Sequence, residues 1–580
     1  MVIPLIPQKV HTMKHLAPLS ALFSLCLALP AVAGTYVWTG AGDGSTWNDA
    51  ANWDLDAVPG ATDTASFTAG GTINLGTTAV SIGTISLNSS GTLVLGTKNS
   101  QIITPTYVSV SGGGTLQFAG VVQMDYDCTW DIAENSSNLV YSAKGAGNFT
   151  KNGPGVLRFT ANASNRTGDT VINEGVVVFS GQRQLGYNFT VGDGVHDAIA
   201  YVAYGSQYNP NLFNSSVSDA TILIRNHGVF DLETYGTAPN VLQQNIGPHL
   251  TVENGGELKM GYFQFVPPNP WELFLVVGGT ITGYGAEGRG YLGLVGSLAE
   301  IPADATHPVF ISARLGVHSV WVNGKGSFFP RFRVVDIPNV PVDLTLAAPI
   351  ITTWDARGSI EKLGPGVMRL CGSATYGGSV ANQGGYTYVR EGTLLADNGP
   401  DGSATGWSMV QVYGGATIGG TGGVCAATNW VTYSQQNIDT NRLYLTVSGT
   451  AEAGVATVAP GSIDPETGAH VHGTLRVGTP EYPAPANLGN YSALVLGVGT
   501  EGAADKLEVT GTLHVTGSPA MLSVTVDDDA APGVYTLVSA SEGIDGAFST
   551  VSFNGPGYLT FRETDIQLTV APKRTVLFIR

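Results

Sequence analysis

The chain has 580 residues and a formal net charge of −18 at pH 7. A chain this acidic offers no electrostatic basis for binding nucleic acid or anionic lipid. Only 12% of its residues are charged, about half of the usual ~25%, and 78 are glycine, so serine, threonine and asparagine must supply most of the polar surface.

The N-terminus is predicted to be a secretory signal peptide. The segment MKHLAPLSALFSLCLALPAVAG begins at Met13 and combines a basic start, an apolar run and an A-x-A site. We expect residues 1–33 to be cleaved after Ala33, whether Met1 or Met13 is the start, and the mature chain to be exported to the cell surface or the extracellular space. No later stretch approaches the ~20 apolar residues of a transmembrane helix.

Residues 34–72 form a tryptophan-rich module that contains Trp38, Trp47 and Trp53. Two interpretations are open. The rings could form a platform on which sugars stack, or they could close the end of a repetitive structure. We favour a small N-terminal cap, because solenoids need an atypical terminal unit to cover their end.

From residue 73 onward, short apolar strands follow one another and glycine introduces each of them. The tripeptide Gly-Thr-Leu recurs at Gly91, Gly114, Gly392, Gly473 and Gly511. This pattern predicts an all-β fold, either a β-helix or a sandwich of many strands. The uniform composition and the imperfect repeats favour a parallel β-helix over residues 73–490, with its C-terminal end over residues 491–580.

Two copies of a longer repeat occupy residues 145–181 and 356–398. They contain NGPGVLRF from Asn152 and LGPGVMRL from Leu363, and a weaker echo, NGPGYLTF, begins at Asn554. Gly-Pro-Gly suits a type II turn, in which the second glycine takes a positive φ. We therefore expect positive φ angles at Gly155 and Gly366. The predicted turn residues are Gly153, Pro154, Gly155, Gly364, Pro365 and Gly366.

The first copy closely resembles the autotransporter-associated β-strand repeat. The family's glycine, lysine and apolar positions are matched by, among others, Gly145, Lys151, Leu157, Phe159 and Gly175. The resemblance implies a right-handed parallel β-helix at or outside the cell surface, similar to an autotransporter passenger. Autotransporters end in a membrane barrel, whereas this sequence ends in VAPKRTVLFIR, so we expect neither self-translocation nor covalent anchoring.

Asp125 and Asp127 in MDYDCTWD are the best candidates for catalysis. Two carboxylates at i and i+2 of a strand face the same side, as hydrolysis by a pair of acids requires, and Trp130 could stack against a sugar. We favour the simpler interpretation of a solvated acidic strand.

His470 and His472 in HVH could supply two ligands to a metal ion. No third ligand is evident nearby, although Asp464 and Glu466 precede them. Cysteines give little further information: a disulfide between Cys371 and Cys425 needs Cα atoms within ~7 Å, and at least one of the three mature cysteines stays unpaired.

These observations predict an exported, non-catalytic β-solenoid with an adhesive or structural role, no cofactor and a monomeric state. Its expected partners are extracellular glycans or surface components. The alternatives are a carbohydrate-active β-helix enzyme, either a polysaccharide lyase or a hydrolase, and a glycan-binding stalk.

Overall fold

The computed structural model describes residues 33–160, 166–180, 185–202, 221–232, 249–260, 264–265, 274–283, 291–295, 298–318, 320–322, 326–352, 358–377, 385–425 and 443–572. The predicted signal peptide lies outside these residues except for Ala33. So does most of the loop that distinguishes the second repeat copy from the first.

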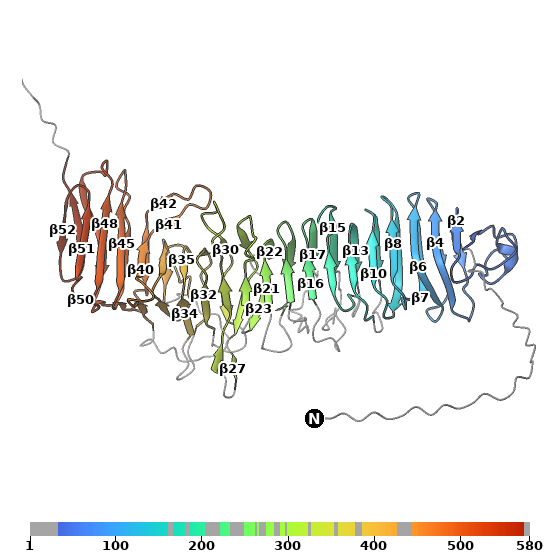
Figure 1. The fold of residues 1–580 in the computed structure, drawn as a ribbon, viewed down its shortest axis with the longest axis horizontal. Helices are drawn as coiled ribbons and strands as arrows, with labels where there is room; N and C mark the ends of the chain where they lie inside the picture. Colours follow the sequence, from blue (N-terminus) through green and yellow to red (C-terminus); the bar gives the residue numbers. More distant parts are fainter. Residues whose placement is uncertain are drawn as a thin grey trace, which may run out of the picture.

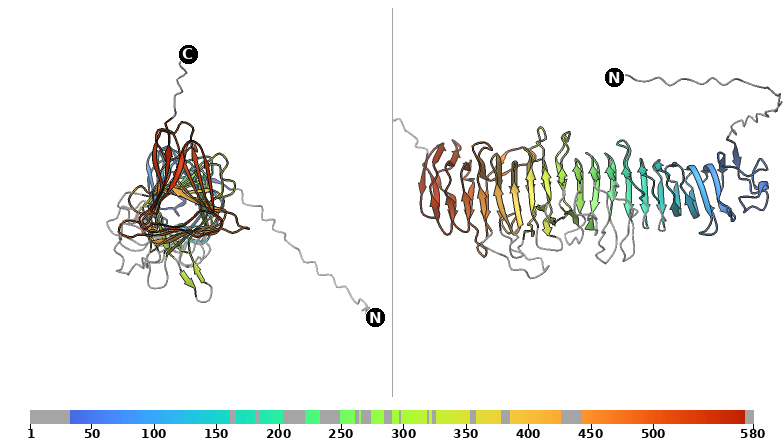
Figure 2. Two further views of the ribbon diagram at one scale, coloured as in Figure 1. Left: turned by 90° about the vertical axis from the view of Figure 1, so that its left-hand side faces the viewer. Right: turned by 60° about the horizontal axis from the view of Figure 1, so that its bottom comes forward.

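The described residues form a long stack of β-coils, with the tryptophan module at one end and the last strands at the other (Figure 1). A view along the axis shows the coils one behind another (Figure 2). Most strands belong to one 39-stranded sheet that consists of two parallel ladders. Each coil adds one strand to each ladder, so the predicted parallel β-helix is confirmed.

The strands of the first ladder are β1 (Thr35–Val37), β2 (Thr64–Phe67), β4 (Val80–Asn88), β6 (Ile102–Ser111), β8 (Cys128–Ile132), β10 (Phe149–Asn152), β12 (Thr170–Ile172), β14 (Phe189–Val191), β16 (Thr221–Ile224), β18 (His249–Val252), β21 (Phe274–Val277), β24 (Leu298–Glu300), β29 (Arg331–Arg333), β32 (Ile360–Leu363), β34 (Gly385–Val389), β36 (Ser408–Val412), β39 (Leu445–Val447), β44 (Ala486–Leu488), β47 (Leu513–Val515) and β50 (Ile544–Gly546).

The strands of the second ladder are β3 (Gly71–Ile73), β5 (Thr92–Leu95), β7 (Thr115–Gln123), β9 (Ser137–Lys144), β11 (Val156–Phe159), β13 (Gly175–Phe179), β15 (Ala198–Val202), β17 (Gly228–Asp231), β19 (Glu257–Met260), β22 (Thr280–Gly283), β25 (Val309–Ile311), β30 (Leu344–Leu346), β33 (Val367–Leu370), β35 (Gly392–Ala396), β37 (Ala416–Gly420), β40 (Ala456–Pro460), β45 (Ser492–Val498), β48 (Ala520–Val526) and β51 (Thr550–Asn554).

Smaller sheets complete the coils. One contains β20 (Gln264–Phe265), β23 (Tyr291–Val295), β26 (Leu315–His318) and β31 (Ile350–Thr352), and another contains β38 (Gly423–Val424), β43 (Thr474–Val477), β46 (Lys506–Val509), β49 (Gly533–Ala540), β53 (Asp565–Val570) and β52 (Tyr558–Phe561). Two hairpins leave the coils: β27 (Val320–Val322) with β28 (Gly326–Phe328), and β41 (Ser462–Ile463) with β42 (His470–Val471). At the C-terminal end, β53 runs antiparallel to both β49 and β52.

The core is a continuous column of apolar side chains inside the stack. Leu157 and Phe159 of β11 are buried while Arg158 between them is exposed, as the period of two predicts. Stacking places equivalent rings of successive coils in contact: the ring centroids of Phe159 and Phe179 are 5.5 Å apart, and the ring planes are nearly parallel. A residue thus contacts the equivalent residue of the next coil. Asn173, for example, donates a side-chain hydrogen bond to Asn152, which precedes it by 21 residues.

The two repeat copies adopt the same arrangement of four strands. In the first copy, β10 pairs with β12 and β11 pairs with β13. In the second copy, β32 pairs with β34 and β33 pairs with β35. Each copy therefore spans two successive coils, which explains why the motif contains two strand pairs separated by a loop.

The predicted turn geometry is wrong in one respect. The glycines with positive φ are Gly153 (76°) and Gly364 (80°), and not Gly155 or Gly366. Gly155 is needed for a different reason: a Cβ there would lie 2.7 Å from the carbonyl oxygen of Ser136. A Cβ on Gly366 would lie 2.7 Å from Oδ2 of Asp343. The second glycine thus allows close approach of the preceding coil.

The repeat lysines are fully buried at these corners. The Nζ of Lys151 donates hydrogen bonds to the carbonyl oxygen of Gly153 and, at 2.8 Å, to that of Glu174 in the next coil. Lys362 does the same with Gly364 (2.5 Å) and Glu391 (2.9 Å). Each ammonium group therefore joins the corners of two successive coils.

The third copy of the octapeptide has a different environment. Its strand β52 pairs antiparallel with β53 instead of parallel with a strand of the next coil. Gly555 and Gly557 both have a positive φ, of 126° and 118°. The sequence similarity at residues 554–561 therefore extends neither to the backbone angles of the turn nor to the stacking.

Within the described residues, none of the helical structure is long and apolar enough to cross a membrane. The helical segment η1 (Ala50–Asn52) is a single short turn in the tryptophan module.

Candidate functional site

The tryptophan module closes the first coils with an aromatic cluster. Trp47 and Trp53 are each 1% exposed and meet edge to face, with ring centroids 5.0 Å apart. Trp38 packs edge to face on Trp53 at 5.1 Å and is partly buried. Since the rings of Trp47 and Trp53 have no free face, the sugar-stacking interpretation is wrong for these two residues, and their burial fits a cap.

Asp125 and Asp127 lie in a bend between β7 and β8, not on a strand. Their predicted position on a common strand face is therefore wrong. Gln123 donates a hydrogen bond to Oδ1 of Asp125, while the backbone N–H of Asn148 donates one to Oδ1 of Asp127 at 3.1 Å. Both acids are exposed. Trp130 is fully buried, so it does not offer a stacking surface beside them.

His470 and His472 extend from the hairpin β41–β42, which leaves the coil after β40. In this hairpin Ser462 pairs with Val471 and Ile463 pairs with His470. Oδ1 of Asp464 accepts the backbone N–H groups of Glu466 and Thr467 at 2.9 and 2.8 Å. Asp464 thus stabilises the hairpin turn instead of joining the histidines.

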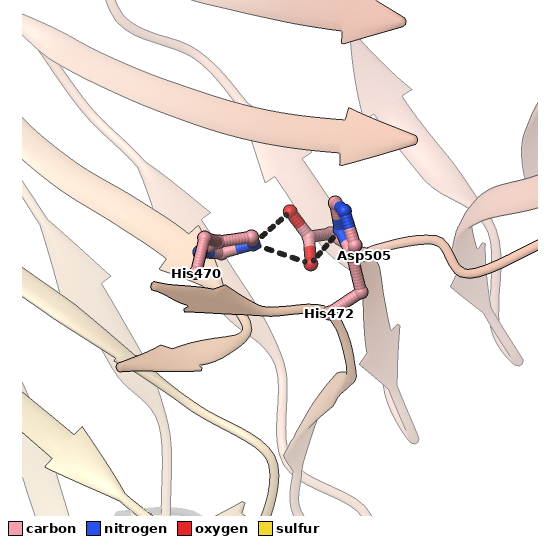
Figure 3. Close-up of side chains that lie close together, drawn as sticks. All are labelled: His470, His472 and Asp505. Carbon is pink, nitrogen blue, oxygen red and sulfur yellow. Dashed lines mark hydrogen bonds and ion pairs between the residues drawn. The ribbon is translucent and has the colours of Figure 1, made fainter. Parts of the chain in front are cut away.

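The third group of this cluster is Asp505, which directly precedes β46 in the next coil (Figure 3). Its Oδ2 lies 2.9 Å from Nε2 of His470, and its Oδ1 lies 3.1 Å from Nδ1 of His472. The imidazole rings meet edge to face, with centroids 4.7 Å apart. We call His470, His472 and Asp505 the histidine–aspartate cluster.

Exposure decreases from one side of the cluster to the other. The side chain of His470 is 46% exposed, that of His472 19% and that of Asp505 only 3%. The buried carboxylate also accepts the backbone N–H groups of Gly497 (2.8 Å) and Gly473 (3.3 Å). These bonds fix the orientation of the carboxylate and leave the imidazoles between it and the solvent.

One nitrogen from each imidazole and one carboxylate oxygen lie within 4.8 Å of one another. Imidazole nitrogen with carboxylate oxygen is the donor set of many zinc sites. The histidines were identified from the sequence, but Asp505 was not, because the coil period is irregular in this region. The strand register is what identifies Asp505. Thr474 pairs with Lys506, so Asp505 lies beside Gly473.

A second group of polar and aromatic residues lies on the outer surface of the stack. Tyr386 and Tyr388 of β34 stack with ring centroids 5.3 Å apart. The guanidinium of Arg390 lies 4.8 Å from the ring centroid of Tyr388 and 3.9 Å from that of Tyr413. We call Tyr386, Tyr388, Arg390 and Tyr413 the tyrosine–arginine patch.

The patch is partly exposed and charged. Tyr386 and Tyr388 occupy the outward positions of β34, and Nε of Arg390 pairs with Oε1 of Glu361 at 2.7 Å. Partial burial and the neighbouring rings raise the pKa of Tyr388 to about 12, so its hydroxyl stays neutral and can donate. The alternation in GYTYVR could have identified both tyrosines from the sequence.

The described cysteines Cys128, Cys371 and Cys425 are all free, so the possible disulfide between Cys371 and Cys425 is not formed.

Comparison with models of known protein families and with curated proteins gives no match for this chain. The resemblance of residues 145–181 to the autotransporter-associated repeat therefore stays a prediction.

Proposed function

We propose that this chain is an exported, non-catalytic β-solenoid that acts outside the cell as an adhesive or structural protein. The tyrosine–arginine patch on the outer face of the stack is the observation that carries the proposal. The repeat residues support it too, because they form turns, corners and core.

The patch has the chemistry of a glycan contact surface. Aromatic rings offer apolar faces on which the C–H groups of a sugar can lie, while tyrosine hydroxyls bind water or polar groups. The arginine supplies hydrogen-bond donors in a fixed plane, and its pairing with Glu361 and the two rings holds it in place. Many weak contacts along an extended polymer would add up through multivalency.

A carbohydrate-active enzyme is the alternative, and the observed geometry gives it little support. Hydrolysis by two acids needs both carboxyl groups to flank one bond. Asp125 and Asp127 instead lie in an exposed bend and bind separate groups of the protein. We therefore do not propose catalysis at this acid pair.

The proposal is tested by co-sedimentation of the purified protein with insoluble cellulose, chitin and peptidoglycan. We expect binding to at least one polymer, and the double variant Tyr386→Ala, Tyr388→Ala should lose most of it. Tyr141→Ala is the matched control, because Tyr141 is an outward residue of β9 that is 39% exposed and lies outside the patch.

Sugar release from the same polymers is measured in parallel, and we expect none. Product formation that disappears in the variant Asp125→Asn, Asp127→Asn would replace this proposal with the enzyme. Equal binding by the wild type and the double tyrosine variant would overturn the role of the patch.

A further inference from the structure

The histidine–aspartate cluster differs from the other described pairs of histidine with aspartate. His196 with Asp193, His227 with Asp197, and His514 with Asp545 each contain one imidazole, and their carboxylates are 25%, 90% and 70% exposed. In the cluster, two imidazoles converge on a single carboxylate that is only 3% exposed. Such convergence on a buried carboxylate brings together three groups of the kinds that bind transition metals in proteins.

We propose that His470, His472 and Asp505 bind a divalent transition-metal ion, with Zn²⁺ the best fit, and that this ion ties the hairpin β41–β42 to the next coil. The three ligand atoms are Nε2 of His470, Nδ1 of His472 and one carboxylate oxygen of Asp505. The donors come from two successive coils, so the ion would strengthen a connection that the contacts of both imidazoles with Asp505 already make.

The distances fit a tetrahedral ion after a small adjustment. Ligands that bind Zn²⁺ at about 2.0–2.1 Å in tetrahedral geometry lie roughly 3.3 Å from one another. The distances from Oδ1 of Asp505 are 3.0 Å to Nε2 of His470 and 3.1 Å to Nδ1 of His472. An outward movement of a few tenths of an ångström by the imidazoles would bring both nitrogen–oxygen distances to this value, and the two nitrogens already lie within 4.8 Å of each other. His470 is the more exposed imidazole, and water can complete the coordination from its side.

The surroundings of the cluster are suited to hold the ligands. The N–H groups of Gly497 and Gly473 bind the carboxylate and orient it, as groups around a metal centre commonly do. The backbone opposite the rings is glycine: a Cβ on Gly461 would lie 2.7 Å from Nε2 of His470, and one on Gly497 would lie 3.0 Å from Cε1 of His472. A Cβ on Gly499 would lie closer still to His472, with Nε2 as its nearest atom. Larger residues at these three positions would displace the imidazoles.

The donor set also predicts selectivity. Two imidazoles and one carboxylate suit Zn²⁺ and similar first-row ions, whereas Ca²⁺ and Mg²⁺ prefer six or more oxygen ligands.

The test is isothermal titration calorimetry of the purified, metal-stripped protein with ZnCl2 near pH 7.5, with CaCl2 and MgCl2 as comparisons. We expect a single Zn²⁺ site with a dissociation constant of about 1 µM or below and no calcium or magnesium binding there. His470→Gln and His472→Gln should each weaken binding at least roughly tenfold. His514→Gln, which removes the histidine of an ordinary pair, should leave binding unchanged.

Hydrogen exchange supplies a second measurement. Zn²⁺ should slow the exchange of backbone amides in residues 462–472, and it should not do so in the His470→Gln variant. His470 is half exposed, so this variant should fold normally. A loss of the zinc effect in it would therefore reflect the loss of a metal ligand and not unfolding. The proposal is overturned if no Zn²⁺ binds below about 100 µM, or if binding is the same in both glutamine variants and the wild type.

Discussion

Two regions of the molecule bring polar side chains between successive coils, and they do so in different ways. At the repeat corners, Lys151 and Lys362 are buried and donate to backbone carbonyl oxygens of their own and the next coil. In the histidine–aspartate cluster, side chains from two coils meet each other at the solvent boundary. The repeated lysines donate hydrogen bonds to backbone carbonyl groups, whereas the cluster presents side-chain nitrogen and oxygen atoms to which an ion can bind.

The difference indicates where function is to be sought in such a stack. A group that recurs in both repeat copies with the same carbonyl partners serves the scaffold. A group that occurs once, on a hairpin outside the coil, is free to serve binding. The following predictions test this contrast, beginning with the largest expected effect.

Replacing a corner lysine should be the most damaging change. Lys151→Met or Lys362→Met leaves buried carbonyl oxygens without a donor, and we expect a loss of about 2–4 kcal/mol in local stability. Hydrogen exchange of the strand amides in residues 149–159 or 360–370 measures this loss. Lys98→Met, at an exposed position, should have almost no effect. Equal exchange in all three variants would show that the corner lysines are dispensable.

The glycine after the proline should be the next most sensitive position. Gly155→Ala places a methyl group against the preceding coil, and we expect a cost of about 2–3 kcal/mol. Gly399→Ala is the matched control, because Gly399 has a φ of 81° and open space around its Cβ position. It should cost only about 1 kcal/mol. If hydrogen exchange showed a larger loss of stability for Gly399→Ala, close approach of the preceding coil would not explain why position 155 requires glycine.

The corner lysines also predict a dependence of stability on pH. Burial lowers the pKa of Lys151 and of Lys362 to about 8, against about 10.5 in the unfolded chain. Between these values the unfolded state binds more protons, so the lysine contribution to stability rises as the pH increases from about 8 to about 10.5. We expect a gain on the order of 3 kcal/mol for each lysine.

The measurement is the difference in thermal midpoint between wild type and the double variant Lys151→Met, Lys362→Met, recorded at several pH values. The double variant lacks both titrating groups, so the gap between the two proteins should widen as the pH rises through this range. A constant gap would mean that the ammonium groups titrate normally.

The smallest effect on stability is expected at the cluster. In metal-free protein, His470→Gln removes one contact of a side chain that is 46% exposed, and it should cost no more than about 0.5 kcal/mol. Local exchange in residues 462–472 measures it. A loss as large as that of the lysine variants would mean that the cluster serves the scaffold, and the contrast between the two regions would fail.

Much of the scaffold could be predicted from the sequence, because local rules determine it. The alternation around Leu157 and Phe159 predicted the buried face, and the imperfect repeats indicated a parallel β-helix. The same alternation places Lys151 on the inner side with Phe149, although its burial was not predicted, since its carbonyl partner Glu174 comes from the next coil. The positive φ was assigned to Gly155 instead of Gly153 because the contact that demands a glycine at position 155 is not local.

The cluster was predicted only in part for the same reason. His470 and His472 are close in sequence, but Asp505 belongs to the next coil, 35 residues beyond His470. Contacts within one coil follow from periodicity. Contacts between coils depend on loop lengths, and these vary along the chain.

Small-angle X-ray scattering of the purified protein most directly tests the central claim, that the chain is an extended scaffold with an outer surface available for binding. About 20 coils at ~4.8 Å spacing give a rod with a length on the order of 100 Å. The account predicts a pair-distance distribution with a long tail to this dimension. A symmetric distribution with a radius of gyration of about 24 Å, as expected for a compact domain of this size, would contradict it.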